Sequence, residues 1–249
     1  MVFQPHIDFW GFAIKVLKHN RYFLSEESRE FLDALLATST SRNHLLLKNT
    51  ELWRAQLGCE WTKPDDNHQI PEPCSYNQER MKPLSRKVGD GRANPRRIAY
   101  LYTATDVDTA IAEIRPWISS FVSVGLFSTE RDLHLVDCSC DYPTLETQLQ
   151  SRVLTADERE CEVWADVNYA FSRPINQNKD DADYIPTQVI AEWFKVNGFD
   201  GIIYRSSLGP GKNCCLFDTR TANLESCHVY RVSKVAYSFY KLLIDTPGA

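Results

Sequence analysis

Gly89-Asp-Gly-Arg-Ala-Asn94, followed by Pro95 and the apolar run Ile98-Ala-Tyr-Leu-Tyr-Thr103, is the stretch that decides between two architectures of helices and strands. It begins like the dinucleotide-binding pattern Gly-x-Gly-x-x-Gly, but Asn94 replaces the last glycine. That pattern needs a strand before it and a helix after it, whereas a strand follows here. A doubly wound nucleotide-binding sheet is therefore excluded at this point, and a flexible turn that presents Arg92 remains.

Helices and short strands follow one another in mixed order around this turn, which favours an α+β fold. Strands are expected at 51–57, 98–103, 120–127, 133–137, 201–205, 214–217 and 229–232. Helices are expected at 105–115, 155–171 and 186–198, and also through residues 1–50, where Ser25 has the chemistry of an N-cap. Residues 58–80 are polar and contain prolines, so a long loop is expected there.

The composition is that of a globular domain. The chain has 249 residues, of which 43% are hydrophobic and 24% are charged, so it can bury a sizeable core without disulfides or metal. A net charge of −5 argues against broad affinity for nucleic acid or anionic membranes. No apolar run approaches the roughly 20 residues of a membrane span. The first eight residues have no basic region, so no secretory signal is expected and a cytoplasmic protein is favoured.

One segment carries the opposite charge. Between Arg80 and Arg97 there are seven basic residues and one acid, Asp90. A charge run of this kind is commonly a solvated face, and the alternative is a local site for an anion. Both interpretations stay open at this stage.

The cysteines indicate a reduced protein. The chain has eight, at positions 59, 74, 138, 140, 161, 214, 215 and 227. None of them forms a Cys-x-x-Cys pair, and the spacings of Cys138-Ser-Cys140 and Cys214-Cys215 suit neither zinc nor a disulfide. We therefore expect free, mostly buried thiols and no metal site.

Two candidate binding residues lie on and after the glycine turn, residues 89–94. Arg92 on the turn could grip a phosphate with two parallel hydrogen bonds from its guanidinium. Tyr102 lies on the next strand, where its ring could stack on a flat heterocycle or simply belong to the core. The sequence pattern alone does not choose between these roles for Tyr102.

Two further candidates come from separate segments. Glu113 lies off the apolar stripe that Val107, Ile111 and Ile114 form on their helix, so it is free to face a cleft or water. Ser206 ends the strand at 201–205, where a hydroxyl either forms a turn or binds a substrate. No Ser-His-Asp, P-loop or kinase signature is present, so these four side chains are the best candidates for chemistry.

This ordered combination resembles the RES-domain family, which is named for an arginine, a glutamate and a serine. The matching segments are Leu52-Trp-Arg-Ala55, Gly91-Arg-Ala-Asn-Pro95, Tyr100-Leu-Tyr-Thr103, Thr109-Ala-Ile-Ala-Glu113, Gly201-Ile-Ile-Tyr-Arg-Ser206 and Asn213-Cys-Cys-Leu-Phe217. They span roughly residues 50–220. Two details depart from the family pattern, because Ala93 stands where many members have an aromatic residue and no glycine follows Pro95 closely.

The resemblance implies an α+β fold like that of ADP-ribosyltransferases, with a split β-sheet around an NAD cleft and flanking helices. Residues 51–249 would form this RES domain, and residues 1–50 an N-terminal helical extension. Many members are bacterial toxins paired with a helix-turn-helix antitoxin. Some deplete NAD and others ADP-ribosylate a protein target.

The resemblance also implies roles for individual residues. The implied catalytic set is Arg92, Tyr102, Glu113 and Ser206. The implied NAD-binding set is Arg54, Arg92, Asn94, Tyr102 and Ser206. The arginines would hold the phosphate and ribose side, and Tyr102 would stack on nicotinamide. Glu113 would bind ribose hydroxyls and stabilise the cation that forms there, and Ser206 would orient the nicotinamide ribose.

The leading expectation is an NAD-consuming toxin that cleaves the ribosyl–nicotinamide bond by hydrolysis or phosphorolysis. The alternatives are an ADP-ribosyltransferase that modifies a protein, and an inactive NAD-binding module. NAD is expected as substrate without a metal. Expected partners are an antitoxin, a protein target and a second copy of the chain, with no direct contact to nucleic acid or membrane.

Overall fold

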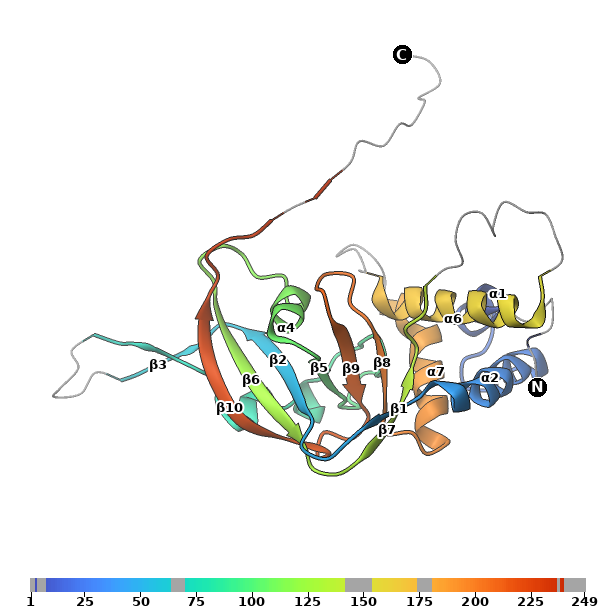
Figure 1. Ribbon diagram of the computed structural model, residues 1–249, viewed down its shortest axis with the longest axis horizontal. Helices are drawn as coiled ribbons and strands as arrows, with labels where there is room; N and C mark the ends of the chain where they lie inside the picture. Colours follow the sequence, from blue (N-terminus) through green and yellow to red (C-terminus); the bar gives the residue numbers. More distant parts are fainter. Residues whose placement is uncertain are drawn as a thin grey trace, which may run out of the picture.

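An eight-stranded mixed sheet runs through the computed structural model of the protein (Figure 1). The structure describes residues 3, 8–63, 70–141, 154–173, 181–236 and 238–239. The strand order is β1 (Asn43–Leu46), β7 (Leu133–Asp137), β8 (Gly201–Arg205), β9 (Lys212–Leu216), β5 (Leu101–Ala104), β2 (Glu51–Leu57), β6 (Phe121–Thr129) and β10 (Ala222–Arg231). Only β7 and β8 pair in parallel, and the other neighbours are antiparallel. The expected α+β class is confirmed.

The sheet parts between β2 and β5. These strands are in register at Trp53 and Ala104 alone, whereas β2 pairs with β6 along its whole length from Glu51 to Leu57. Helix α4 (Val107–Glu113) follows β5 directly and packs on β2. The split therefore brings together side chains on one face of β2, side chains on one face of β5 and the C-terminal end of α4.

Four helices cover the half of the sheet that contains β1, β7 and β8 (Figure 1). They are α1 (Phe9–Lys18), α2 (Glu26–Ser39), α6 (Ala156–Ser172) and α7 (Ile185–Val196). Their aromatic side chains form one core, in which Phe12 stacks on Phe31 and Trp164 on Phe194. Helices from the first fifty residues thus share a core with helices from the second half of the chain.

Local signals place several helix ends where the sequence predicts them. Ser25 caps α2 by accepting a hydrogen bond from the Ser28 amide. Thr155 and Glu158 form a reciprocal capping box at the start of α6. Gly198 follows α7 with φ +91°, a conformation that L-residues avoid.

Two expectations need correction. Residues 1–50 are not helical throughout, because residues 43–46 form β1 and pair with β7 at the edge of the sheet. The stretch 58–80 is not a plain loop, since β3 (Glu60–Trp61) pairs with β4 (Pro73–Cys74) and α3 (Gln78–Met81) follows. Residues 64–69 of that stretch lie outside the described residues. Both errors concern short elements that depend on partners elsewhere in the chain.

All eight cysteines are free thiols in the structure, and Cys138, Cys214 and Cys215 are buried. The described residues contain no group of three side chains suited to hold a metal ion. None of the helices in this part of the chain is long and apolar enough to cross a membrane.

Candidate functional site

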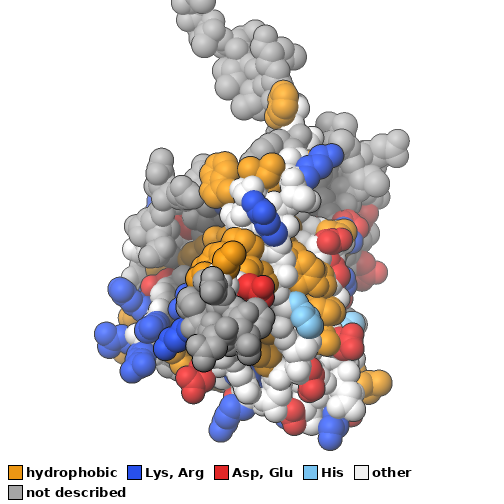
Figure 2. Space-filling view, turned by 90° about the vertical axis from the view of Figure 1, so that its left-hand side faces the viewer, with side chains coloured by type: hydrophobic (Ala, Val, Ile, Leu, Met, Phe, Trp, Pro, Cys, Tyr) orange, Lys and Arg blue, Asp and Glu red, His pale blue; other side chains and the backbone are white. Residues whose placement is uncertain are grey.

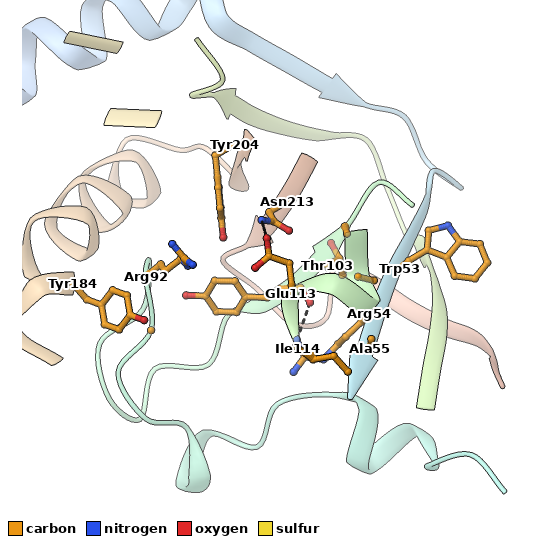
Figure 3. Close-up of a pocket in the computed structure, with 14 residues that line it drawn as sticks. Trp53, Arg54, Ala55, Arg92, Thr103, Glu113, Ile114, Tyr184, Tyr204 and Asn213 are labelled. Atoms are coloured by element: carbon orange, nitrogen blue, oxygen red, sulfur yellow. Dashed lines mark hydrogen bonds between the residues drawn. The ribbon is translucent and has the colours of Figure 1, made fainter. Parts of the chain in front are cut away.

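A cavity of about 340 Å³ opens where β2 and β5 part (Figure 3). Arg54 from β2, Arg92 from the glycine turn, Tyr102 from β5 and Glu113 from α4 all line it. Four of the six residues that the sequence singles out therefore meet in one cavity. Ser206 and Asn94 do not line it, and each contacts a residue that does.

Glu113 is the last residue of α4 and faces the cavity. Asp106 caps the helix by accepting a hydrogen bond of 2.7 Å from the Thr109 amide, and Thr109 and Ala110 are its buried positions. The Oε1 atom of Glu113 accepts hydrogen bonds from Ser206 Oγ at 2.7 Å and from Asn213 Nδ2 at 2.6 Å. Within the described part of the chain, no hydrogen bond reaches Oε2. One carboxylate oxygen is thus held by the protein and the other is available to a ligand.

The Ser206 hydroxyl is fully used inside the protein. It donates to Glu113 and accepts hydrogen bonds from the amides of Leu208 at 3.0 Å and Gly209 at 2.9 Å. A hydroxyl has one hydrogen to donate and two lone pairs, so these three bonds satisfy it. These bonds hold the hydroxyl between Glu113 and the turn that follows Ser206.

The turn that follows Ser206 rests on the first turn of α4. The Gly211 amide donates to Thr109 Oγ1 at 2.8 Å. A Cβ atom at Gly209 would lie 2.5 Å from the Cα of Thr109, and one at Gly211 would overlap the Asp106 carboxylate. Both glycines are therefore required by close approach, and they join the Ser206 turn to the helix that carries Glu113.

Arg54 is a partly buried cation without an acidic partner in the described residues. Its Nη1 donates to the Tyr102 carbonyl at 2.7 Å, and its Nε is buried with no hydrogen-bond partner. Burial lowers the pKa of Arg54, since removal from water penalises the charged form. A partly buried guanidinium with an unsatisfied nitrogen, lining a cavity, is suited to an anionic ligand.

Arg92 lines the cavity, and one of its guanidinium nitrogens is hydrogen-bonded to the backbone. Its Nη1 donates to the carbonyls of Phe171 at 2.7 Å and Arg173 at 2.6 Å, at the C-terminal end of α6. Carbonyls at a helix end lack intrahelical partners and favour a cation. Arg92 therefore fastens the glycine turn to α6, and its remaining nitrogens are the ones open to a ligand.

Tyr102 and Asn94 close the glycine turn from inside. The Tyr102 hydroxyl donates to Asn94 Oδ1 at 2.8 Å and accepts from the Ala93 amide at 3.0 Å. Asn94 is buried, and its Nδ2 donates to the carbonyls of Gly89 and Pro95. Burial raises the pKa of Tyr102 well above its usual value, so the phenol stays neutral. Asn94 therefore holds the hydroxyl of Tyr102, a residue that also lines the cavity.

The sequence interpretation missed other residues of the cavity. Asn213, Tyr204 and Tyr184 line it, and Asn213 touches Glu113 directly (Figure 3). Burial raises the pKa of Tyr204, whose ring stacks on Phe171. The one available signal was Asn213 itself, a buried amide that begins the apolar strand end Cys214-Cys215-Leu216. A buried polar residue in such a strand needs a hydrogen-bond partner.

Comparison with known proteins identifies one family and one solved structure. The family model of the RES domain matches residues 51–239. The solved structure of the M. tuberculosis MbcT-MbcA toxin-antitoxin complex matches with 12% sequence identity and a TM-score of 0.41. That match covers 80% of this chain and 92% of the other. No curated protein sequence matches.

Proposed function

The chain belongs to the RES-domain family, and from this premise we propose that it is an enzyme that consumes NAD by cleaving its ribosyl–nicotinamide bond. The observation that carries the proposal is the pairing of opposite charges across one cavity. Glu113 presents a carboxylate oxygen there, and Arg54 presents a partly buried guanidinium with an unsatisfied nitrogen. NAD has the matching charges, an anionic pyrophosphate and a cationic nicotinamide ring.

The proposed chemistry follows from the bond that breaks. Departure of nicotinamide leaves positive charge on the ribose, as in glycoside cleavage. A fixed carboxylate next to that ribose stabilises the charge in the transition state more than in the substrate. The two hydrogen bonds to Oε1 of Glu113 keep the carboxylate in place, and Oε2 faces the ribose. Nicotinamide leaves as a neutral molecule, and water or phosphate takes its place on the ribose.

The other residues bind and orient. Arg54, together with the free nitrogens of Arg92, binds the pyrophosphate, and the Tyr102 ring packs against nicotinamide. Asn94 and Ser206 position Tyr102 and Glu113 rather than touching NAD. In this proposal the Ser206 contact to the nicotinamide ribose becomes indirect.

The basic segment between Arg80 and Arg97 supports an anionic substrate. Five of its seven basic side chains are exposed: Arg80, Arg86, Lys87, Arg96 and Arg97. Lys and Arg side chains also gather at one edge of the face drawn in Figure 2. A local positive surface on an otherwise acidic protein draws anions to it. We assign this positive surface to attracting the dinucleotide and to contacting its adenosine end, which extends beyond the cavity.

Incubation of the pure protein with NAD tests the proposal and identifies the acceptor. Free ADP-ribose indicates hydrolysis, and a phosphorylated ADP-ribose formed only in phosphate buffer indicates phosphorolysis. Label transferred to an added protein extract indicates an ADP-ribosyltransferase. Binding of NAD without any product would contradict the enzyme and leave a nucleotide-binding module. Glu113→Gln is the control that ties a product to this cavity.

A growth-inhibiting role and an antitoxin partner extend the proposal to the cell. If the protein drains NAD, its expression should arrest a bacterial host and lower cellular NAD. The Glu113→Gln variant at equal level should do neither. Arrest with normal NAD would shift the role to modification of a protein target.

A further inference from the structure

Cys140 and Cys161 are in contact outside the proposed active site. Cys140 follows the end of β7, and Cys161 lies on α6. Their Sγ atoms are 3.6 Å apart, and both side chains are partly exposed. A disulfide has an S–S distance of about 2.05 Å, so closing this pair needs an approach of about 1.5 Å. The two thiols are therefore near enough to bond after a small local movement.

Arg42 lies beside the Cys140 thiol. Its Nη2 donates to Cys140 Sγ at 3.7 Å, and its guanidinium is fixed over the Trp164 ring at 4.6 Å. Partly exposed thiols beside a cation are the ones that react with oxidants. Burial and the neighbouring thiol raise the pKa of Cys161 to about 11, which disfavours its thiolate. Cys140 is suited to react first with an oxidant, and Cys161 to react second, with the oxidised Cys140.

We propose that Cys140 and Cys161 form a reversible oxidation site that hydrogen peroxide converts to a disulfide, with an effect on the Ser206 turn. In the first step the Cys140 sulfur bonds to one peroxide oxygen, the O–O bond breaks, and the thiol proton leaves with the other oxygen as water. In the second step the Cys161 sulfur bonds to that of Cys140, the S–O bond breaks, and the second water leaves with the Cys161 proton. Two thiols lose two electrons, and one peroxide becomes two waters.

A hydrogen-bonded path links this pair to Ser206. Asn168 on α6 donates to the Cys140 carbonyl at 3.2 Å and accepts from the Arg205 amide at 3.2 Å. Arg205 also forms a two-point ion pair with Asp141, the residue after Cys140. Movement of Cys140 toward α6 displaces these partners of Arg205, and Arg205 precedes Ser206 directly. Oxidation should therefore loosen the bonds that Ser206 makes to its own turn.

Peptide mapping tests the bond itself. The reduced, desalted protein is treated with one equivalent of hydrogen peroxide, alkylated and digested without reductant. We expect a peptide pair linked through Cys140 and Cys161 that dithiothreitol separates. It should be absent from Cys161→Ser and present in Cys227→Ser, whose thiol lies on β10 at the opposite edge of the sheet. Cys140→Ser serves as a second variant if Cys161→Ser does not fold. Absence of the linked pair in the wild type overturns the proposal.

Amide hydrogen exchange tests the effect on Ser206 without relying on the proposed function. The Leu208 and Gly209 amides, which donate to Ser206 Oγ, should exchange several-fold faster in the oxidised wild type than in the reduced protein. Peroxide-treated Cys161→Ser should keep the slow rate. Equal rates in the oxidised and reduced wild type overturn the connection to Ser206. Failure of NAD cleavage would leave both tests unchanged.

Discussion

Ser206 Oγ donates a hydrogen bond of 2.7 Å to Oε1 of Glu113 across 93 positions of sequence. Asn213 Nδ2 donates to the same oxygen at 2.6 Å. Residues at two separate strand ends thus hold one carboxylate oxygen of Glu113, and the other oxygen is left toward the cavity. Substitutions can therefore separate the effect of the carboxylate itself from that of the groups that orient it.

Glu113→Gln should lower the rate of NAD cleavage by about 100-fold or more, because the amide has no charge to stabilise the ribosyl cation. Its oxygen can still accept from Ser206 and Asn213, so the free energy of unfolding should stay within about 1 kcal/mol of wild type. NAD consumption and thermal unfolding, measured on the same preparation, check both parts. Wild-type turnover in this variant would remove Glu113 from the mechanism.

Ser206→Ala should lower kcat by about 10- to 100-fold with a smaller change in KM, because a misplaced carboxylate affects the transition state most. Loss of the acceptor for two turn amides should also cost about 1–2 kcal/mol of stability. Ser207→Ala is the matched control, since that hydroxyl donates to the Ser172 carbonyl instead. Equal kinetic losses in the two variants would argue against a specific role for Ser206.

Substitutions of Asn213 test the second hydrogen-bond donor to Glu113. Asn213→Ala should lower kcat more than it raises KM, as for Ser206. Asn213→Asp keeps the shape but places a second carboxylate against Glu113, and two carboxylates sharing a site cannot both ionise easily. The acid limb of the pH–rate profile should therefore move to higher pH in Asn213→Asp alone. An unmoved profile would mean that Asn213 has a purely structural role.

Gly209→Ala should weaken both stability and turnover. Its Cβ would meet the Cα of Thr109 at 2.5 Å, so the Ser206 turn and α4 must separate, at a cost of about 1–3 kcal/mol. Gly89→Ala is the control, because a Cβ there meets nothing within 4 Å. Thermal unfolding and NAD turnover of both variants provide the comparison. A neutral Gly209→Ala would show that the turn is free to shift.

Arg54→Met should weaken NAD binding by about 10-fold or more while leaving the melting temperature unchanged or higher. The guanidinium has a buried, unsatisfied Nε and no acidic partner in the described residues, so removing its charge relieves a desolvation cost. Titration with ADP-ribose and thermal unfolding measure the two effects. A large loss of stability with unchanged affinity would mean that Arg54 serves the fold and not the ligand.

Elements defined by nearby residues could be predicted from the sequence. The strands at 51–57, 133–137 and 201–205 have the expected bounds, and the Thr155–Glu158 box starts α6 as expected. Strand alternation and helix caps depend on residues only a few positions apart. The sequence pattern failed for β1 and for the β3–β4 pair, because a short strand exists only through its partner.

The candidate site, too, could be predicted only in part from the sequence. The sequence by itself determined which residue types serve it, through the order of Arg54, Arg92, Tyr102, Glu113 and Ser206 along the chain, and it placed Glu113 off its helix's apolar stripe. Only the tertiary structure decided how these side chains are used. One nitrogen of Arg92 donates to a carbonyl at the end of α6. Ser206 donates to Glu113, and so does Asn213, which lies 100 positions away from it. Such contacts arise from strand register and from the split between β2 and β5, and no pattern of neighbouring residues encodes them.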